Sequence, residues 1–344
     1  MQITTVGLDL AKNIFQVHGI NEQGEVLIRR RLRRAQLVSF FASLKPCLVG
    51  MEACGTAHFW ARELMELGHQ VRIIPPAYVK AYVRRNKNDA ADAQAICEAV
   101  TRPTMRFVPV KTEQQQAALM LHKARDLLVR QQTMLVNALR SHLAELGLIA
   151  SQGRGRAEDV IAVIEDAEDQ SIPVLARSAL KPLVDQLRAA EDAIRALADE
   201  LTTWHRSNEA SQRLATIPGI GILTATAIAV TVPDATAFRS GREFAAWIGL
   251  SPRQSSSGGK ERLGRISKQG NRYLRRLLVI GATAVLRYAR GKSAPAAAWV
   301  NGLLARRPAR LVSVAMANKT ARIAWALLAR NETYRRPQAC AEMA

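Results

Sequence analysis

The sequence predicts a mixed α/β amino-terminal domain followed by a mainly helical remainder. Strand and helix signals alternate over the first 110 residues, and long leucine-rich amphipathic stretches follow them. The last third is expected to be helical, except for a segment rich in glycine, serine and arginine at 251–270. With 344 residues, of which 48% are hydrophobic, the chain is long enough for two domains with connecting helices.

The order of the amino-terminal elements indicates the type of sheet. A helix is expected near Ala35–Leu44, after three strands, and a second helix separates the last two strands. The expected strands are Ile3–Leu8, Ile14–His18, Val26–Arg30, Cys47–Met51 and Val71–Ile74, and the second helix is Thr56–Leu67. The turn Asn21–Gly24 joins the second and third strands, and Gly68 ends the second helix. This order is the one expected of a ribonuclease-H-like sheet.

The middle of the chain is predicted to contain long helices. Thr112–Gly147 and Leu183–Trp204 repeat leucine and other apolar residues at helical spacing. Two interpretations remain open, since the helices could pack on each other within one chain or form a dimerising coiled coil. Between them, Ser151–Arg156 is expected to be a loop, and residues 157–180 are expected to hold short helices.

Charge and cysteine usage narrow the class of protein. The net charge of +20 favours a polyanionic partner, DNA or RNA, over a merely soluble basic protein. The cysteines form no CxxC pair, so a zinc ribbon is not expected. They are Cys47, Cys54, Cys97 and Cys340. A secretory signal and a membrane helix are not expected either, and we therefore predict a cytoplasmic protein with reduced cysteines and no membrane partner.

Four acidic residues are candidates for a metal site. Asp9 and Glu52 end two of the expected strands, whereas Asp89 and Asp92 open a helix and share one of its faces. Because ligands gather at the carboxyl ends of strands in an open sheet, a helix crossing that edge would bring the four together. Clustered carboxylates repel one another without cations, and their hard oxygens suit Mg²⁺ or Mn²⁺. The local alternative is that Asp89 caps the helix and Asp92 favours its first turn.

A glycine-rich turn lies between two expected helices in Leu214–Val230. It reads Pro218-Gly219-Ile220-Gly221. Such a turn can point backbone N–H groups and a helix N-terminus at a phosphate without reading sequence, as in a helix-hairpin-helix motif. Pro218, Gly219 and Gly221 are therefore candidate nucleic-acid contacts. The alternative is a tight helix–helix connection that touches no nucleic acid.

The basic segment 251–276 is the candidate for a nucleophile. It is rich in small residues, which let a backbone approach a phosphate closely. A serine there could attack a phosphodiester if cations stabilise the transition state, and Ser257, just before two glycines, is our choice. The alternative is a mobile phosphate-binding loop. The candidate phosphate-binding cations are Arg253, Lys260, Arg262, Arg265, Lys268, Arg272, Arg275 and Arg276.

Over nearly its whole length the chain resembles the DEDD-type transposases of the insertion-sequence-110 family, which are related to pilin-gene invertases. The matching stretches, in the family's order, are GLDLAKNIFQVHG, GMEACGTAHFWA, NKNDAADA, IPGIG and FAAWIGLSPRQSSSGGKERLGRISKQGNRYLRR. The resemblance implies a RuvC-like domain, of the ribonuclease-H-like, Holliday-junction-resolvase type. The family's four acids fall on Asp9, Glu52, Asp89 and Asp92.

The same resemblance implies a carboxy-terminal transposase domain with a nucleophilic serine. Aligning the family pattern gives Ser257, and Ser256 or Ser255 stay open because the local loop length varies. The predicted division is therefore a RuvC-like metal domain, a helical or coiled-coil region, a transposase domain and a loose tail. Their predicted bounds are 1–110, 111–210, 211–334 and 335–344.

The expected function follows from this resemblance. Family members are guided by a structured (bridge) RNA from the element's own non-coding end, which pairs with donor and target DNA, and a charge of +20 suits such partners. The family pattern also implies a dimer of dimers that joins the acids of one subunit to the serine of another. We expect a recombinase that exchanges DNA strands through a covalent phosphoserine, assisted by Mg²⁺ or Mn²⁺.

Three other functions are compatible with parts of the sequence: an endonuclease, a nucleic-acid-binding scaffold and a kinase. A RuvC-like structure-specific endonuclease would use the same acids with water as nucleophile. A nucleic-acid-binding scaffold without catalysis would not need intact acids. An ATP-using kinase of the actin-like type would need glycine-rich phosphate loops, and GxG turns are absent from the first 110 residues.

Overall fold

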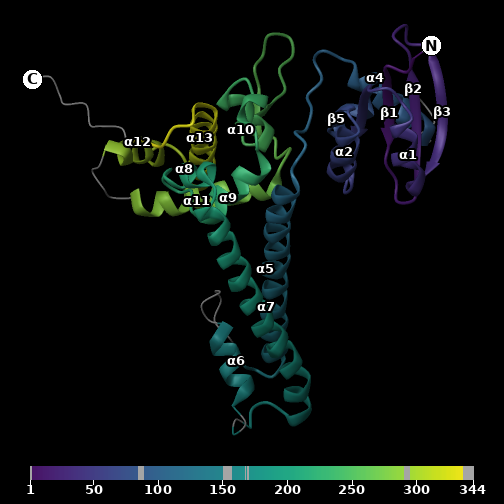
Figure 1. Ribbon diagram of the computed structural model, residues 1–344. Helices are drawn as coiled ribbons and strands as arrows, with labels where there is room; N and C mark the ends of the chain where they lie inside the picture. Colours follow the sequence, from purple (N-terminus) through teal and green to yellow (C-terminus); the bar gives the residue numbers. More distant parts are fainter. Residues whose placement is uncertain are drawn as a thin grey trace, which may run out of the picture. The chain divides into compact units, whose positions relative to one another are not determined.

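The computed structural model describes residues 2–83, 89–149, 157–166, 168, 170–289 and 295–335. The chain forms two compact units, Met1–Gln114 and Gln115–Ala344, each with hydrophobic cores of its own (Figure 1). The loop expected at Ser151–Arg156 and, apart from residue 335, the tail expected at 335–344 lie outside the described residues. Among the described helices, none combines the length and the apolar character needed to cross a membrane.

A five-stranded sheet with the strand order β3-β2-β1-β4-β5 forms the centre of the first unit. The first three strands are antiparallel neighbours, and β4 and β5 run parallel to β1. The strands are β1 Thr5–Asp9, β2 Ile14–Ile20, β3 Val26–Arg33, β4 Leu48–Glu52 and β5 Gln70–Ile74. The predicted order of strands and helices is confirmed, and the mixed sheet is consistent with a ribonuclease-H-like fold.

Helices cover both faces of this sheet because its buried residues alternate between them. On one face, Leu8, Phe15 and Met51 pack with α1 (Leu37–Ala42) and α2 (Ala57–Glu66). A 3-10 turn at 34–36 precedes α1 and accounts for the rest of the helix expected there. The other face is covered by α4 (Asp89–Val100), and the short α3 (Pro76–Val79) and a 3-10 turn at 80–82 lie against it.

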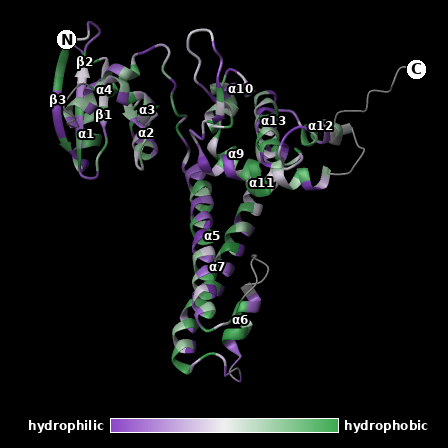
Figure 2. Ribbon diagram, turned by 180° about the vertical axis from the view of Figure 1, so that it is seen from behind, coloured by the Kyte–Doolittle hydropathy of each residue, from purple (hydrophilic) through white to green (hydrophobic). Residues whose placement is uncertain are grey.

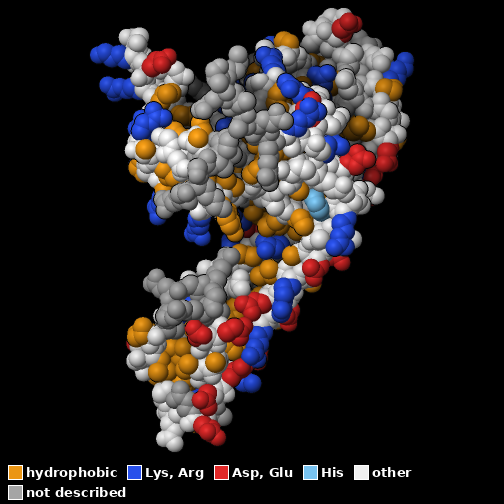
Figure 3. Space-filling view, turned by 90° about the vertical axis from the view of Figure 1, so that its left-hand side faces the viewer, with side chains coloured by type: hydrophobic (Ala, Val, Ile, Leu, Met, Phe, Trp, Pro, Cys, Tyr) orange, Lys and Arg blue, Asp and Glu red, His pale blue; other side chains and the backbone are white. Residues whose placement is uncertain are grey.

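Two long helices, α5 (Glu113–Glu145) and α7 (Val174–Arg206), lie side by side in the second unit (Figures 1 and 2). They share a core to which α5 contributes Leu139 and Leu143 and α7 contributes Val184 and Leu187, together with the short helix α6 (Ala157–Glu165). Figure 3 shows acidic and basic side chains interspersed along this helical pair, as expected of a solvated face. Packing within one chain is therefore observed, and a dimerising coiled coil stays a prediction.

The predicted start of the second long helix was wrong. The helix was expected from Leu183, with short helices at residues 157–180. It begins instead at Val174 and contains Pro182. Leu180 and Val184 are both buried in the core shared with α5, so the apolar face continues across the proline. Burial of that face therefore outweighs the hydrogen bond that proline cannot make.

The rest of the second unit is a group of helices with one large core and a smaller one, to which α12 contributes Val300. Buried residues of α9, α10, α11 and α13 form the large core, for example Phe244, Leu274 and Ala321. The helices are α8 Glu209–Ala215, α9 Ile222–Thr231, α10 Gly241–Ile248, α11 Arg272–Ala289, α12 Pro295–Leu304 and α13 Ala309–Arg330. As expected, the segment between α10 and α11 is not helical, since it forms a ribbon of two strands, β6 (Pro252–Gln254) and β7 (Leu263–Ile266).

Candidate active site

Three of the four predicted metal ligands come together. Asp9, Asp89 and Asp92 each offer a carboxylate oxygen, and these oxygens all lie within 4.8 Å of one another. Asp9 ends β1, and the other two stand in the first turn of α4, where the helix dipole favours negative charge. The local explanation accounts for the two acids of the helix, but not for the approach of Asp9. We name these three residues the acid cluster.

Two glycines allow α4 to lie close enough to the sheet to build this cluster. A Cβ atom on Gly7 would stand 2.1 Å from the carbonyl oxygen of Ala93, and one on Gly50 would stand 2.7 Å from Cβ of Val100. No larger residue fits at such distances, so the helix backbone rests directly on β1. Because Asp9 follows Gly7 by two residues, its side chain points to the same face as the helix.

Glu52 occupies the position that strand pairing predicts, but it is not a member of the acid cluster. Gly7 pairs with Gly50 and Leu8 with Met51 in the parallel β1–β4 register. Continuing that register by one residue puts Glu52 beside Asp9, on the face that α4 covers. Glu52 is half-buried and ends β4. The structure therefore brings three predicted ligands together and sets the fourth at the adjacent strand end.

The sequence contained a signal for this arrangement that our prediction did not use. Both strands end in the pattern glycine–any residue–acid, as Gly7-Leu8-Asp9 and Gly50-Met51-Glu52. A glycine two residues before an acid marks a strand on which a helix can rest beside that acid. Hard carboxylate oxygens at this spacing fit a divalent cation such as Mg²⁺ or Mn²⁺.

The cysteines near the sheet serve packing. Cys97 of α4 faces the sheet, where its Cβ lies 2.7 Å from the position that a Cβ on Gly7 would take, and burial raises the pKa of its thiol to about 11. Cys47 is also buried, with a pKa raised by burial to about 11, and its sulfur lies 3.4 Å from Nδ1 of His69. Both residues therefore stay protonated near neutral pH, which suits small buried side chains and not metal ligands.

Ser257 lies at the tip of a β-hairpin formed by β6, β7 and the residues between them, which we name the serine hairpin (252–266). The N–H group of Lys260 donates to the carbonyl oxygen of Ser257 at 3.1 Å, across a two-residue turn. The turn residues Gly258 and Gly259 have φ values of 56° and 75°. A type I′ turn requires positive φ at both positions, which explains the glycine pair.

The three candidate serines differ in the face that they occupy. Ser255 and Ser257 are two residues apart in the segment that continues from β6 in the same cross-strand register, so their side chains share a face of the hairpin. Ser256 points to the opposite face, where its hydroxyl accepts a hydrogen bond from Nε2 of Gln254 at 3.1 Å. The cross-strand neighbour of Ser255 is Arg262, whose carbonyl oxygen accepts from the Ser255 N–H at 3.0 Å.

An open groove of about 440 Å³ runs along the serine hairpin. It contains four of the predicted phosphate-binding cations and one candidate serine, Ser255. Its lining residues are Arg253, Ser255, Arg262, Leu263, Gly264, Arg265, Ile266 and Lys268. Lys260 and Arg272 are exposed outside this lining. Six of the eight predicted cations therefore face solvent on or next to the hairpin.

The other two cations, Arg275 and Arg276, are engaged within the protein. Nη1 of Arg275 donates to the carbonyl oxygens of Ile248 and Gln269, at 2.6 and 2.8 Å. Burial and then the nearby Arg272 lower the pKa of this guanidinium. Arg275 thereby ties the start of α11 to the segments on both sides of the hairpin. Its observed contacts are structural, and phosphate binding by it stays untested.

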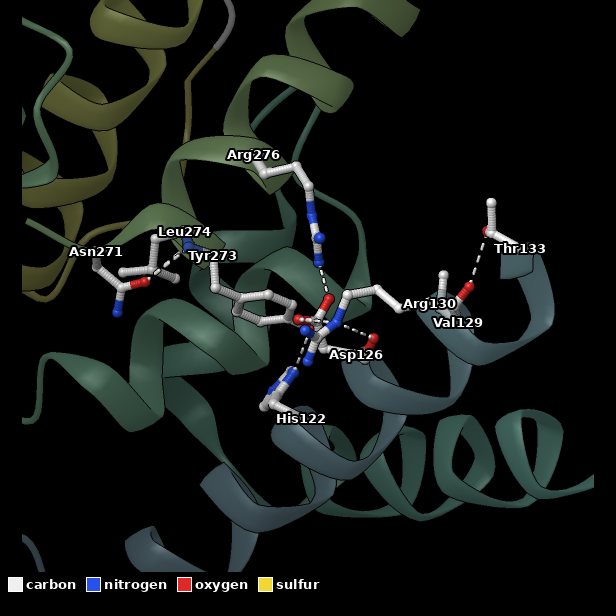
Figure 4. Close-up of polar contacts among 9 residues, drawn as sticks. All are labelled: His122, Asp126, Val129, Arg130, Thr133, Asn271, Tyr273, Leu274 and Arg276. Carbon is white, nitrogen blue, oxygen red and sulfur yellow. Dashed lines mark hydrogen bonds and ion pairs between the residues drawn. The ribbon is translucent and has the colours of Figure 1, made fainter. Parts of the chain in front are cut away.

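Arg276 takes part in a polar cluster between α5 and α11 that the sequence did not predict (Figure 4). It forms an ion pair with Asp126 and lies over the ring of Tyr273, 5.2 Å from its centroid. The Tyr273 hydroxyl is hydrogen-bonded to Nδ1 of buried His122 at 3.1 Å. Burial raises the pKa of Tyr273 to about 12, and burial with the neighbouring Arg125 lowers that of His122 to about 4.

The glycine-rich turn at 218–221 joins α8 to α9. At Gly219, which has a φ of 86°, an added Cβ would stand 3.0 Å from the carbonyl oxygen of Gly281 in α11. Gly219 is therefore used for packing. Pro218 and Gly221 are exposed, and nothing lies within 4 Å of the position that a Cβ on Gly221 would take. The exposed side of the turn leaves a phosphate contact open.

Comparison with known proteins places both regions in one family. A DEDD transposase model of the IS110 group matches residues 6–147, and a model described as transposase IS116/IS110/IS902 family matches residues 211–296. A protein of Pseudomonas aeruginosa described as a probable family 20 transposase is 50% identical over 97% of this chain and 99% of its own length. This chain belongs to the IS110 family of insertion-sequence transposases.

Other relatives of this transposase extend the comparison. The transposase for insertion sequence element IS1111A of Coxiella burnetii is 44% identical over 97% of this chain and 92% of its own length. A pilin gene-inverting protein of Moraxella bovis is 25% identical over 83% of this chain and 84% of its own. The transposase is thus a DNA-processing enzyme, whose acid cluster lies in one matched region and whose serine hairpin lies in the other.

Proposed function

We propose that this transposase is an RNA-guided DNA recombinase that exchanges strands through a covalent phosphoserine. The observation that carries the proposal is the acid cluster, with three carboxylate oxygens within 4.8 Å in the region matched by the DEDD transposase model. The exposed serine hairpin with its surrounding cations supports the nucleophilic part. The proposed division assigns 1–110 to metal binding, 111–210 to the helical connection and 211–334 to the serine chemistry.

The acid cluster and Glu52 would hold the divalent cation. Asp9, Asp89 and Asp92 offer hard oxygen ligands at a fixed spacing, and Glu52 ends the neighbouring strand. When bound, Mg²⁺ or Mn²⁺ supplies positive charge that stabilises the oxygens of a phosphodiester during cleavage. The protein's part is to hold the carboxylates in place, which α4 does by resting on Gly7.

The serine step conserves the energy of the phosphodiester. The hydroxyl oxygen of Ser257 forms a bond to phosphorus, the bond from phosphorus to the 3′ oxygen breaks, and that oxygen leaves as a 3′ hydroxyl after taking up a proton. A 3′ hydroxyl of the exchanged strand then attacks the phosphoserine, which releases the serine and rejoins the DNA. The number of phosphodiester bonds is unchanged, so no ATP is consumed.

The hairpin supports Ser257 as nucleophile, with Ser255 as the other candidate on the same face. Both lie on the face opposite Ser256, whose hydroxyl is hydrogen-bonded to Gln254. Charge on the attacked phosphate would be offset by the exposed cations. These are Arg253, Lys260, Arg262, Arg265, Lys268 and Arg272. Arg275 donates to the segments on both sides of the hairpin, and Arg276 ties α11 to α5, so both are already engaged by the protein.

The partners proposed for the transposase are donor DNA, target DNA and the guide RNA of the same element. A net charge of +20 suits several polyanions at once. Pairing of the guide with both DNAs would supply the sequence specificity that phosphate contacts cannot give. The exposed residues of the turn, Pro218 and Gly221, would add a sequence-independent phosphate contact. We propose a homodimer that assembles to a tetramer, in which α5 and α7 provide the connecting arm.

The test is a search for the covalent adduct. The full chain is incubated with Mg²⁺, its guide RNA and end-labelled donor and target DNA, and a denaturing protein gel is run for wild type, Ser257→Ala, Ser255→Ala and Asp9→Ala. We expect a labelled adduct in wild type and Ser255→Ala that is absent from Ser257→Ala and Asp9→Ala. An adduct lost only in Ser255→Ala moves the role to that residue. Cleaved DNA without any adduct favours the RuvC-like nuclease that uses water.

A further inference from the structure

A row of arginines on β3 is exposed at the edge of the sheet. The carboxyl half of this strand reads Arg29-Arg30-Arg31-Leu32-Arg33, and all four arginines are exposed. Figure 2 shows β3 changing from hydrophobic to hydrophilic along its length. Charged residues on an edge strand commonly prevent it from pairing with another chain. This role needs only one or two cations and does not explain four arginines within five residues.

The strand register puts two of these arginines on the same sheet face as the acid cluster. Asp9 of β1 pairs with Gln16 of β2, and Gln16 pairs in turn with Arg31 of β3. Directly opposed residues of antiparallel strands project to the same face, so Asp9 and Arg31 belong to one cross-strand row. Two strand spacings separate their backbones, which is about 10 Å. Two residues along the strands, Gly7 of β1 pairs with His18 of β2, and His18 pairs with Arg29 of β3.

Contacts on both faces support this assignment. Arg30 points to the opposite face, where its guanidinium lies 6.0 Å from the ring centroid of Phe40, and Leu32 is buried among α1 and α2. On the α4 face, His18 is buried, and burial together with the charge of Arg29 lowers the pKa of its imidazole. Arg29 and Arg31 therefore flank α4 on the side that carries Asp9.

Among the residues that the structure describes, the charges of this row are not neutralised by ion pairs, since neither Arg29 nor Arg31 forms one. Alternate residues of a strand stand about 6.8 Å apart, so Arg29, Arg31 and Arg33 form a line of cations directed along β3. A line of like charges with its guanidinium groups exposed matches a polymer of phosphates better than a single small anion.

We propose that Arg29, Arg31 and Arg33 form a phosphate-binding track that holds the backbone of the DNA strand to be cut beside the acid cluster. The proposal rests on the proposed function only in taking the acid cluster as the place where DNA is cut. The serine step is not needed for binding. The track would give the amino-terminal unit its own DNA-binding surface, in addition to the cations of the serine hairpin.

The test compares two arginines that are adjacent in sequence and lie on opposite faces. Binding of the full chain to fluorescein-labelled donor duplex is measured by anisotropy over a range of salt, with EDTA present to prevent cleavage. Each lost phosphate contact lowers the slope of log affinity against log salt by about 0.9. We expect this reduction for Arg31→Gln, about 1.8 for the double variant Arg29→Gln with Arg31→Gln, and the wild-type slope for Arg30→Gln.

Equal slopes for Arg31→Gln, Arg30→Gln and wild type would overturn the track, as would equal reductions in both variants. A parallel titration with the guide RNA alone separates the two nucleic acids, because a reduction confined to RNA contradicts the DNA assignment. Ethylation of phosphates next to the cleavage site is expected to weaken binding of wild type more than binding of Arg31→Gln, which has already lost one of the contacts. Interference only at distant phosphates would also refute the proposal.

The outcome can be told apart from failure of the serine mechanism. Ser257→Ala is expected to keep the wild-type salt slope, since the serine makes no part of the track. If no covalent adduct forms with Mg²⁺ but Arg31→Gln still lowers the slope, the mechanism fails and the track stands. If the adduct forms and the slopes are equal, the reverse holds. Matching thermal unfolding of Arg30→Gln and Arg31→Gln excludes a folding defect as the cause.

Discussion

The acid cluster and the serine hairpin are built in opposite ways. The acids stand on β1 and α4, whose backbones touch at Gly7, so their spacing is set by a packed core. The candidate serines stand on a ribbon whose strands have three and four residues, with nearly every side chain exposed. Metal ligands need a fixed geometry, whereas a serine that carries a DNA end needs access to its substrate. The packed acid cluster thus lies in the first unit, and the exposed serine hairpin lies in the second.

The largest expected effect is loss of the acid cluster. Asp9→Asn removes a charged ligand that stabilises the cleavage transition state by several kcal/mol, so strand cleavage should fall by at least about 10³-fold. In calorimetric titration without DNA, Mn²⁺ affinity should fall more for Asp9→Asn and Asp92→Asn than for Glu52→Gln, because only the first two belong to the cluster. Unchanged Mn²⁺ binding by Asp9→Asn would contradict this.

The polar cluster between α5 and α11 should make the second unit sensitive to acid. The pKa of His122 is about 4 in the folded state and 6.5 when free, so the unfolded chain takes up a proton first as the pH falls. The contribution of neutral His122 to the free energy of unfolding is therefore fully present above about pH 6.5 and decreases toward about pH 4. The expected decrease between pH 7 and pH 4.5 is about 2.5 kcal/mol. Urea unfolding should show this loss in wild type and Tyr273→Phe but not in His122→Gln. Parallel pH profiles of wild type and His122→Gln would show that His122 titrates normally.

A methyl group at Gly7, where α4 rests on the sheet, should displace α4 and so change the spacing of the acid cluster. Gly7→Ala forces its Cβ against the carbonyl oxygen of Ala93, and such overpacking costs about 1–3 kcal/mol. Thermal unfolding should show the lower stability, with weaker Mn²⁺ binding. Gly55→Ala is the matched control, since nothing lies within 4 Å of the added Cβ. Equal melting temperatures for the two variants would refute the packing argument.

The smallest expected effect concerns the turn of the serine hairpin. Alanine at Gly258 or Gly259 must adopt a positive φ, which costs about 1–2 kcal/mol per residue. Because the hairpin buries little, the melting temperature should hardly change, whereas adduct formation should slow by about 5- to 30-fold. Gly264→Ala, whose Cβ meets only ordinary contacts, should leave the rate unchanged. A full rate with both turn alanines would show that the turn does not position the serine.

Much of the fold could be predicted because it depends on local pattern. The five strands were found from short apolar runs, and each boundary lies within a few residues of the prediction. The predicted start of α7 was wrong because the apolar repeat was followed only from Leu183, whereas burial of Leu180 and Val184 against α5 extends the helix back through Pro182 to Val174. The long-range contact decided the outcome where local propensity was weak.

The sequence by itself determined which residues are candidates for the chemistry, namely the acids at strand and helix ends and the serines and cations after residue 250. Only the tertiary structure decided which of these candidates lie close together. It put Asp9 with the acids of α4, engaged Arg275 and Arg276 in contacts within the protein, and aligned Arg31 with Asp9 across three strands. Periodicity is a property of neighbours in the chain, whereas these contacts depend on strand register and on close packing between distant segments.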